Sequence, residues 1–150
     1  MIIKNIALAG HAGTGKTTLL EALLYQGGCV ERMGSVAAGT TVSDAAPEEI
    51  KRHSSVYTAT GSIMLDGQKI NLLDTPGMFD FAGGMVQGIS AADCVMITVS
   101  GKSGVRVGTK KAYRAAKGKP RMFVVTKLDD ENANFYKHFT EKENGFLQDW

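Results

Sequence analysis

Short runs of apolar residues alternate along this chain with longer stretches of mixed character, and the runs have the length of buried strands. A dipeptide that favours a two-residue hairpin, Asp66-Gly67, separates the second run from the third. The pattern therefore predicts strands at Ile2–Ala9, Val56–Leu65, Lys69–Leu73, Cys94–Val99 and Arg121–Thr126.

Helical periods lie between these strands. Lys16–Gln26 carries its leucines on one face and is followed by two glycines, which predicts an amphipathic helix that stops at this point. Thr109–Lys117 is predicted to be a basic helix, and Asp130–Thr140 to begin a last helix. Residues 29–54 have no sustained period, and a loop of this length is usually functional or disordered.

Strands that alternate with helices predict an α/β domain with a mostly parallel sheet. Ligands of such sheets bind outside the carboxyl ends of the strands. Three polar segments follow strands at this kind of position, namely Gly10–Thr17, Asp74–Gly77 and Thr126–Asp129. Their coincidence at one edge indicates function more strongly than any one of them alone.

The first of these segments, Gly10–Thr17, reads GHAGTGKT and fits the phosphate-binding pattern G-x-x-x-x-G-K-[ST] between a strand and a helix. Its glycines let the backbone approach phosphate oxygens, and the N–H groups at the helix start form an anion site. Lys16 is expected to reach the β- and γ-phosphates of a nucleotide, and the Thr17 hydroxyl to bind Mg²⁺. His11 has no evident chemical partner, and we interpret its side chain as structural.

The second segment is the sequence DTPG at the end of an apolar strand. Asp74 can orient a magnesium-bound water beside the phosphate loop. Gly77 can offer a backbone N–H to a γ-phosphate because no side chain blocks the approach. The Pro76-Gly77 pair also favours a turn. Because loss of the γ-phosphate contact would release this loop, we expect it to act as a switch.

The third segment is the sequence TKLD after the strand Arg121–Thr126. The carboxylate of Asp129 can accept two hydrogen bonds from the N1–H and exocyclic amine of guanine, a pair of donors that adenine lacks. The stem of Lys127 can cover the base. Alone, this tetrapeptide would indicate an exposed turn, but its place downstream of the other two loops predicts guanine recognition.

The composition agrees with a single domain of 150 residues, with 43% hydrophobic residues. The formal net charge of +2 is too small to indicate nucleic-acid binding by itself. Cys29 and Cys94 stand far apart, which suits a reducing compartment. The chain has no apolar stretch long enough to span a membrane and no signal peptide before the first strand. We therefore expect a cytoplasmic protein that binds neither membranes nor DNA.

Together these segments resemble the GTPase domain of translation elongation factor G, from about Ile3 to Phe135. Ribosomal protection proteins for tetracycline resistance are close relatives of that family. The resemblance implies a P-loop NTPase fold of three α/β/α layers, with GTP or GDP and Mg²⁺ as cofactors and the ribosome as partner of the full-length protein. It extends beyond the three loops to Thr41–Asp44, Pro47–Glu49, Phe79–Phe81, Ser103–Thr109 and Glu131–Ala133.

The chain departs from the family pattern at several positions. Where the family has Arg-Gly-Ile-Thr-Ile, this chain has Arg52–Val56, so that Ser55 replaces the magnesium-binding threonine and His53 replaces a glycine. Met78 stands where the family has the histidine that orients the attacking water, and a thioether is a weak hydrogen-bond acceptor. Thr126 replaces an asparagine and can supply only part of its hydrogen bonding.

These considerations define the candidate site residues. Lys16 and Met78, the latter at the position of the usual histidine, are the candidate catalytic positions. Thr17, Ser55 and Asp74 are the candidate magnesium ligands. The candidate nucleotide-binding residues are His11, Ala12, Gly13, Thr14, Gly15, Lys16, Thr17, Thr18, Asp74, Gly77, Thr126, Lys127 and Asp129.

The leading hypothesis is that residues 1–150 are the N-terminal portion of the GTP-binding domain of a translational GTPase, truncated at its carboxyl end and without the following domains. We expect a monomer whose own GTP hydrolysis is very slow. A second hypothesis, favoured by Met78, is a nucleotide-dependent switch that barely hydrolyses GTP. A third is a P-loop nucleotide kinase, against which the DTPG and TKLD sequences argue.

Overall fold

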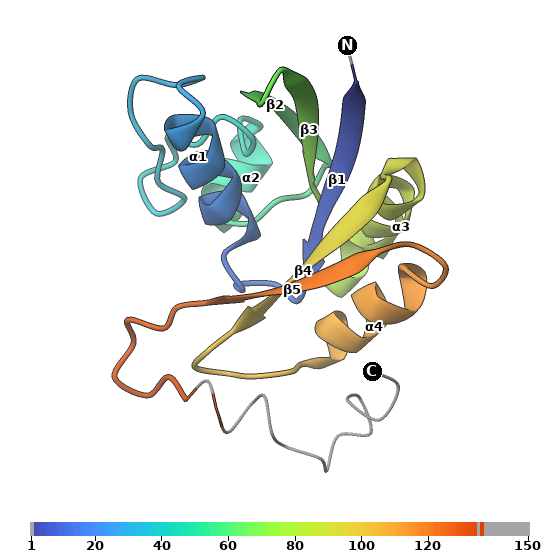
Figure 1. Cartoon of the computed structure of the whole chain (residues 1–150). Coiled ribbons are helices and arrows are strands. Elements are labelled where there is room, and N and C mark those ends of the chain that lie inside the picture. Colours follow the sequence, from blue (N-terminus) through green and yellow to red (C-terminus); the bar gives the residue numbers. More distant parts are fainter. Residues whose placement is uncertain (1, 135, 137–150) are drawn as a thin grey trace.

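The computed structural model describes residues 2–134 and 136. Its core is a five-stranded sheet in the order β2-β3-β1-β4-β5 (Figure 1). The central strand β1 runs parallel to both of its neighbours, β3 and β4, and β5 runs parallel to β4. Only the edge strand β2 is antiparallel to its neighbour. The strands span Ile3–Gly10 (β1), Ala59–Leu65 (β2), Gln68–Asp74 (β3), Cys94–Ser100 (β4) and Arg121–Thr126 (β5).

Helices cover both faces of this sheet. Helix α1 (Lys16–Gln26) packs on β1, β2 and β3 from one side, whereas α3 (Ala82–Ala91) and α4 (Val107–Ala115) pack from the other side (Figure 1). A short helix α2 (Pro47–Arg52) and a 3₁₀ turn η1 (Phe79–Phe81) lie in the connections. The arrangement confirms the predicted three-layer α/β/α fold with a mostly parallel sheet.

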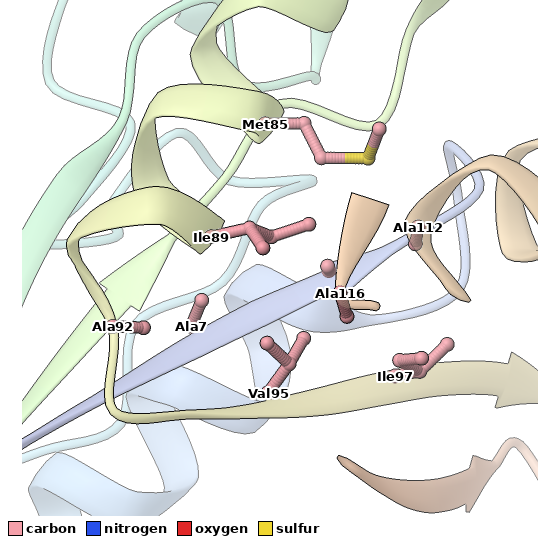
Figure 2. Close-up of a cluster of buried hydrophobic side chains, with 9 residues drawn as sticks. Ala7, Met85, Ile89, Ala92, Val95, Ile97, Ala112 and Ala116 are labelled. Atoms are coloured by element: carbon pink, nitrogen blue, oxygen red, sulfur yellow. The ribbon is translucent and has the colours of Figure 1, made fainter. Parts of the chain in front are cut away.

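Two apolar clusters hold the layers together. On the side of α3 and α4, alanines of β1 and α4 meet Met85 and Ile89 of α3 and Val95 and Ile97 of β4 (Figure 2). The small side chains Ala112 and Ala116 let α4 lie close to the sheet. On the opposite side, leucines of α1 pack on Leu8 and Leu72. Burial of these side chains fixes the carboxyl ends of the strands, where the three polar loops begin.

Several local predictions are confirmed. The bounds of α1 and β5 agree with the sequence pattern. Asp66 and Gly67 connect β2 and β3 as a two-residue hairpin, and both have positive φ (48° and 74°), as a type I′ turn requires. The conformation of these elements depends mainly on residues that are close in the sequence, so the sequence pattern alone was sufficient to locate them.

Other elements differ from the prediction. Strand β2 begins at Ala59 rather than at Val56, because the backbone N–H groups of Val56 and Tyr57 donate to the Glu49 carboxylate instead of to a neighbouring strand (both 3.0 Å). The sequence pattern did not predict α2 or α3. In α3 the glycines, among them Gly84 and Gly88, lower helix propensity, and the helix is stabilised by its packing on the sheet.

The last two predicted helices also change. Helix α4 begins two residues early, at Val107, where the Thr109 hydroxyl accepts a hydrogen bond from the Arg106 N–H (3.2 Å). Residues 130–134 do not begin a helix but form a turn, since Asp130 Oδ1 accepts from the Asn132 N–H at 2.9 Å. Residue 136 is helical, and the rest of the predicted helix falls outside the described residues. No helix in the described part of the chain has the length and apolar character needed to cross a bilayer.

Candidate nucleotide-binding site

The loops that follow β1, β3 and β5 meet at one edge of the sheet, around a cavity of about 410 Å³. Its walls come from the phosphate loop, from the long connection before β2, and from single residues after β3 and β5. The lining residues are Ala12, Gly13, Gly15, Lys16, Thr17, Thr18, Val36, Ala37, Asp44, His53, Ser54, Ser55, Gly77 and Lys127.

The phosphate loop is held in a wrapped conformation by its own residues. Gly15 has a φ of +84°, which a residue with a side chain rarely adopts. The Lys16 ammonium folds back over the loop, donating to the His11 carbonyl at 3.0 Å and lying 3.4 Å from that of Gly10. Burial lowers the pKa of Lys16, while the nearby Asp74 and Asp44 carboxylates oppose that shift. A buried ammonium beside this loop is well placed to bind an anionic ligand.

The three predicted magnesium ligands come together at the end of β3. The Thr17 hydroxyl donates to Asp74 Oδ2 at 2.6 Å and lies 3.1 Å from the Ser55 hydroxyl. Asp74 is only 1% exposed, and its Oδ1 has no hydrogen-bond partner among the described residues. Burial raises the pKa of Asp74 to about 6. Ser55 and Asp74, which follow Thr17 by 38 and 57 residues in the sequence, therefore form one oxygen-lined site with it.

A second buried carboxylate, that of Asp44, joins this cluster. Asp44 lines the cavity and is 4% exposed, and neither of its carboxylate oxygens accepts a hydrogen bond from the described residues. Burial raises its pKa, whereas the nearby Ser55 hydroxyl opposes the shift. Asp44 was not among the predicted site residues. The only signal in the sequence was its place in the Thr41–Asp44 segment that resembles elongation factor G.

The loop after β3 approaches the phosphate loop closely at Gly77. A Cβ atom at this position would come within 2.7 Å of the Ala12 backbone nitrogen and would collide with the Lys16 ammonium. Glycine is therefore required here because of the close packing against the phosphate loop; the predicted contact of its N–H with a γ-phosphate stays a prediction. Met78, the next residue, is partly buried and does not line the cavity.

His53, unlike Met78, lines the cavity. It follows α2 with a φ of +50°, the left-handed conformation in which glycine is the usual residue. Its Nδ1 lies 3.2 Å from the Val36 carbonyl, and Val36 and Ala37 also line the cavity. The sequence identified His53 only as a replacement for a glycine, and it gave no signal for Val36 or Ala37.

His11 and Thr14 belong to the phosphate loop but do not line the cavity. The His11 ring packs against Phe79, with ring centroids 5.7 Å apart, and burial lowers its pKa. Thr14 is 1% exposed, and its hydroxyl lies 2.6 Å from that of Thr98 on β4. Both side chains support the loop from behind, which agrees with the structural interpretation of His11.

The loop after β5 is only partly assembled around the cavity. The Thr126 hydroxyl donates to the Thr14 carbonyl at 2.7 Å and so connects this loop to the phosphate loop. Lys127 lines the cavity and has a φ of +54°. Asp129 is exposed and lies outside the cavity lining. The predicted base-reading carboxylate is therefore not part of the cavity wall in this structure.

Two further buried glutamates hold the long connection between α1 and β2 against the domain. Glu21 of α1 is fully buried and accepts hydrogen bonds from the backbone N–H groups of Gly34 (3.0 Å) and Val42 (2.6 Å). Glu49 of α2 accepts from Ala46, Val56 and Tyr57 in the same way. These contacts place Asp44 and Ser55 at the cavity although the segment has little regular structure.

We expect Glu21→Gln to destabilise the protein by about 1–3 kcal/mol. One of the two carboxylate oxygens that accept backbone hydrogen bonds would become an amide NH₂ group, which cannot accept, so a buried N–H donor would lose its partner. Urea denaturation followed by circular dichroism measures the free energy of unfolding. Glu31→Gln, the same change at an exposed residue, is the matched control and should alter stability little. Equal stability of the two variants would contradict the anchoring role of Glu21.

This geometry defines a class. A glycine-rich loop between a parallel strand and a helix, with a buried lysine and an acidic strand end beside it, is the site of a P-loop nucleotide-binding protein. The model of the family described as the elongation factor Tu GTP binding domain matches residues 1–150. The chain belongs to this family of GTP-binding domains.

Known relatives agree with the resemblance to elongation factor G. An elongation factor G-like protein of Mycobacterium tuberculosis is 42% identical over 146 residues, 96% of this chain and 20% of that protein. A TetM tetracycline resistance protein of Enterococcus faecalis is 35% identical over 147 residues, 95% of this chain and 23% of that protein. The chain thus spans about a fifth of the length of these curated relatives.

Solved structures give the same result for the fold. A crystal structure from Thermus thermophilus matches with a TM-score of 0.90 at 42% identity, over 96% of this chain and 22% of that one. A bacterial selenocysteine-specific elongation factor matches with a TM-score of 0.75 at 27% identity, over 99% of this chain and 24% of that one. The family gives the nucleotide-kinase hypothesis no support.

Proposed function

We propose that this chain is the nucleotide-binding part of a translational GTPase, in which GTP binding and hydrolysis are coupled to work on the ribosome. The observation that carries the proposal is the convergence of Lys16, Thr17 and Asp74 on one cavity, within a family of GTP-binding domains. The names of the relatives, an elongation factor G-like protein and a tetracycline resistance protein, support a role in translation. Such a protein would act in the cytoplasm, as a monomer whose remaining domains lie outside this chain.

The phosphates would lie along the loop from Ala12 to Thr18. The backbone N–H groups of the loop and the Lys16 ammonium bind anionic oxygens, and a triphosphate would replace the two carbonyl groups that this ammonium now faces. Gly77, which already lies against Ala12, is close enough for its N–H to contact a terminal phosphate. Release of that phosphate would free the loop after β3.

The oxygen cluster fits Mg²⁺. Thr17, Ser55 and Asp74 would hold the ion directly or through water, and Asp44 would supply a second carboxylate. The unpartnered oxygens of Asp74 and Asp44 are buried, and a nearby divalent cation would satisfy them. Oxygen donors that leave several positions for water and phosphate are the set that Mg²⁺ prefers. When bound, the ion would neutralise the negative charge of the phosphates.

Guanine recognition is assigned to Thr126, Lys127 and Asp129. Lys127 already lines the cavity, and Thr126 connects the base loop to the phosphate loop. Asp129 would have to turn towards the cavity when a nucleotide binds. Its carboxylate would then accept two hydrogen bonds from guanine, and it would disfavour adenine because it would lose both partners.

Asp129→Asn tests this assignment. We expect the variant to shift its preference from guanine towards xanthine nucleotides by roughly 10²-fold, because the amide can donate to the additional carbonyl of xanthine. Competition of unlabelled GDP, XDP and ADP against a fluorescent GDP measures the ratio. Asp66→Asn in the distant hairpin makes the same chemical change and should keep the wild-type ratio, since Asn-Gly also favours that turn. Equal competition by ADP and GDP in the wild type would refute guanine recognition.

A further inference from the structure

Charge is distributed very unevenly along this chain. Between Asp93 and Asp129 there are nine lysines and arginines and not one acidic residue. The rest of the sequence has eight basic residues and fifteen acidic ones. The net charge of the whole chain is small, but one unit of it is strongly cationic. This unit comprises β4, α4, β5 and their connections.

Four of these nine cations already have a contact within the domain or a place in the nucleotide cavity. Lys102 pairs with Asp130 at 3.0 Å, and Lys119 donates to the carbonyls of Ser90 and Ala92. Arg121 donates to the Tyr113 carbonyl and lies over its ring. Lys127 lines the nucleotide cavity. Five cations remain, and within residues 2–134 and 136 none has a carboxylate at ion-pair distance: Arg106, Lys110, Lys111, Arg114 and Lys117.

Lys110, Lys111 and Arg114 lie on α4, Arg106 directly precedes it and Lys117 lies just beyond its end; we name these five cations the α4 cationic stripe. The buried residues of α4 are Gly108, Thr109 and Ala112, and Ala116, directly after the helix, is also buried. Lys110, Arg114 and Lys117 follow one another at the spacing of successive helical turns on the remaining surface. The helix packs on β1 and β4, so its outer face is directed away from the sheet (Figure 1).

The stripe begins beside the phosphate loop. A Cβ atom at Gly108 would touch the backbone and ring of His11, so that the first turn of α4 lies directly against this loop. Lys111 lies over the Phe79 ring at 4.5 Å, and Phe79 is 48% exposed. The stripe thus combines a row of cations with an exposed aromatic ring at one end.

We propose that the α4 cationic stripe binds the phosphodiester backbone of RNA. The inference rests on the proposed function, because a protein that works on the ribosome meets an RNA surface. A row of cations without ion-paired carboxylates complements the regularly spaced charges of a phosphate backbone, which it binds without reading sequence. An exposed aromatic ring beside the cations favours RNA over an acidic protein, because unpaired bases stack on such rings.

The test measures binding of a fluorescein-labelled polyuridylate oligonucleotide by anisotropy at several salt concentrations. If all five cations contact phosphates, the logarithm of the association constant should fall with that of salt with a slope of about −3.5, at about −0.7 per contact on a single strand. Lys110→Gln with Arg114→Gln should reduce the slope to about −2.1 and weaken binding about 25-fold at ~0.1 M salt. Lys4→Gln with Lys69→Gln removes the same charge from the start of β1 and β3 and should retain the wild-type slope.

Two parallel measurements separate this proposal from its alternatives. GDP affinity should be the same in both double variants, so failure of nucleotide binding would count against the proposed function and not against the stripe. Polyglutamate of similar length should bind at least tenfold more weakly than the RNA; equal binding would indicate an acidic protein partner and overturn the proposal. A salt-independent wild type, or equal losses in the two double variants, would also overturn it.

Discussion

Lys16→Ala should remove most nucleotide binding. Lys16 is 6% exposed, and its ammonium lies against the phosphate loop, where it would neutralise phosphate charge in a partly desolvated site. Loss of one such charged contact costs roughly 2–5 kcal/mol, which corresponds to roughly a 30- to 4,000-fold rise in the dissociation constant. Isothermal titration with GDP and with a non-hydrolysable GTP analogue measures the effect, and the triphosphate should lose more.

Because Lys16 is buried, the fold of the variant must be checked by circular dichroism. Lys16→Met keeps much of the aliphatic stem and removes only the charge, so it separates lost packing from lost electrostatics. Lys4→Ala, at an exposed position on β1, is the matched control and should bind as the wild type does. A folded Lys16→Met protein with unchanged affinity for the triphosphate would refute the assignment of this lysine.

Met78→His should raise the single-turnover rate of GTP hydrolysis roughly 10²-fold or more, because an imidazole can hold the attacking water where a thioether cannot. GTP affinity should hardly change, since Met78 does not line the cavity. The prediction requires that the loop after β3 moves when the triphosphate binds, so that residue 78 then faces the phosphate. We would make the change in the full-length protein and measure hydrolysis with ribosomes, because this chain spans only about a fifth of its relatives.

His53→Gly is the informative companion to that experiment. It restores the glycine of the family at a position that has a positive φ, so the backbone should tolerate it. If the wild-type protein already hydrolyses GTP as fast as Met78→His, then Met78 is no handicap. A loss of rate in His53→Gly would then assign the water-orienting role to His53, which is the histidine that lines the cavity in the described part of the chain.

Much of the fold and part of the site followed from the sequence by itself. Helix α1, strand β5 and the Asp66-Gly67 hairpin depend on residues that are neighbours in the chain, so that periodicity and turn chemistry were sufficient to locate them. The phosphate loop was equally clear, because a glycine-rich backbone that wraps an anion needs fixed residues at fixed spacing. These features predicted the α/β class and the edge of the sheet at which the site lies.

The tertiary structure alone decided how the long connection before β2 completes the site. Asp44 and His53 line the cavity because the buried Glu21 and Glu49 carboxylates bind backbone N–H groups of the connection between α1 and β2, and such contacts leave no periodic signal. The same applies to α3, whose glycines hide a helix that packing on the sheet stabilises. Asp129 is the opposite case. The sequence identified it as a candidate base-reading residue, but whether it lines the cavity depends on how the loop after β5 packs. A local sequence pattern does not encode that packing.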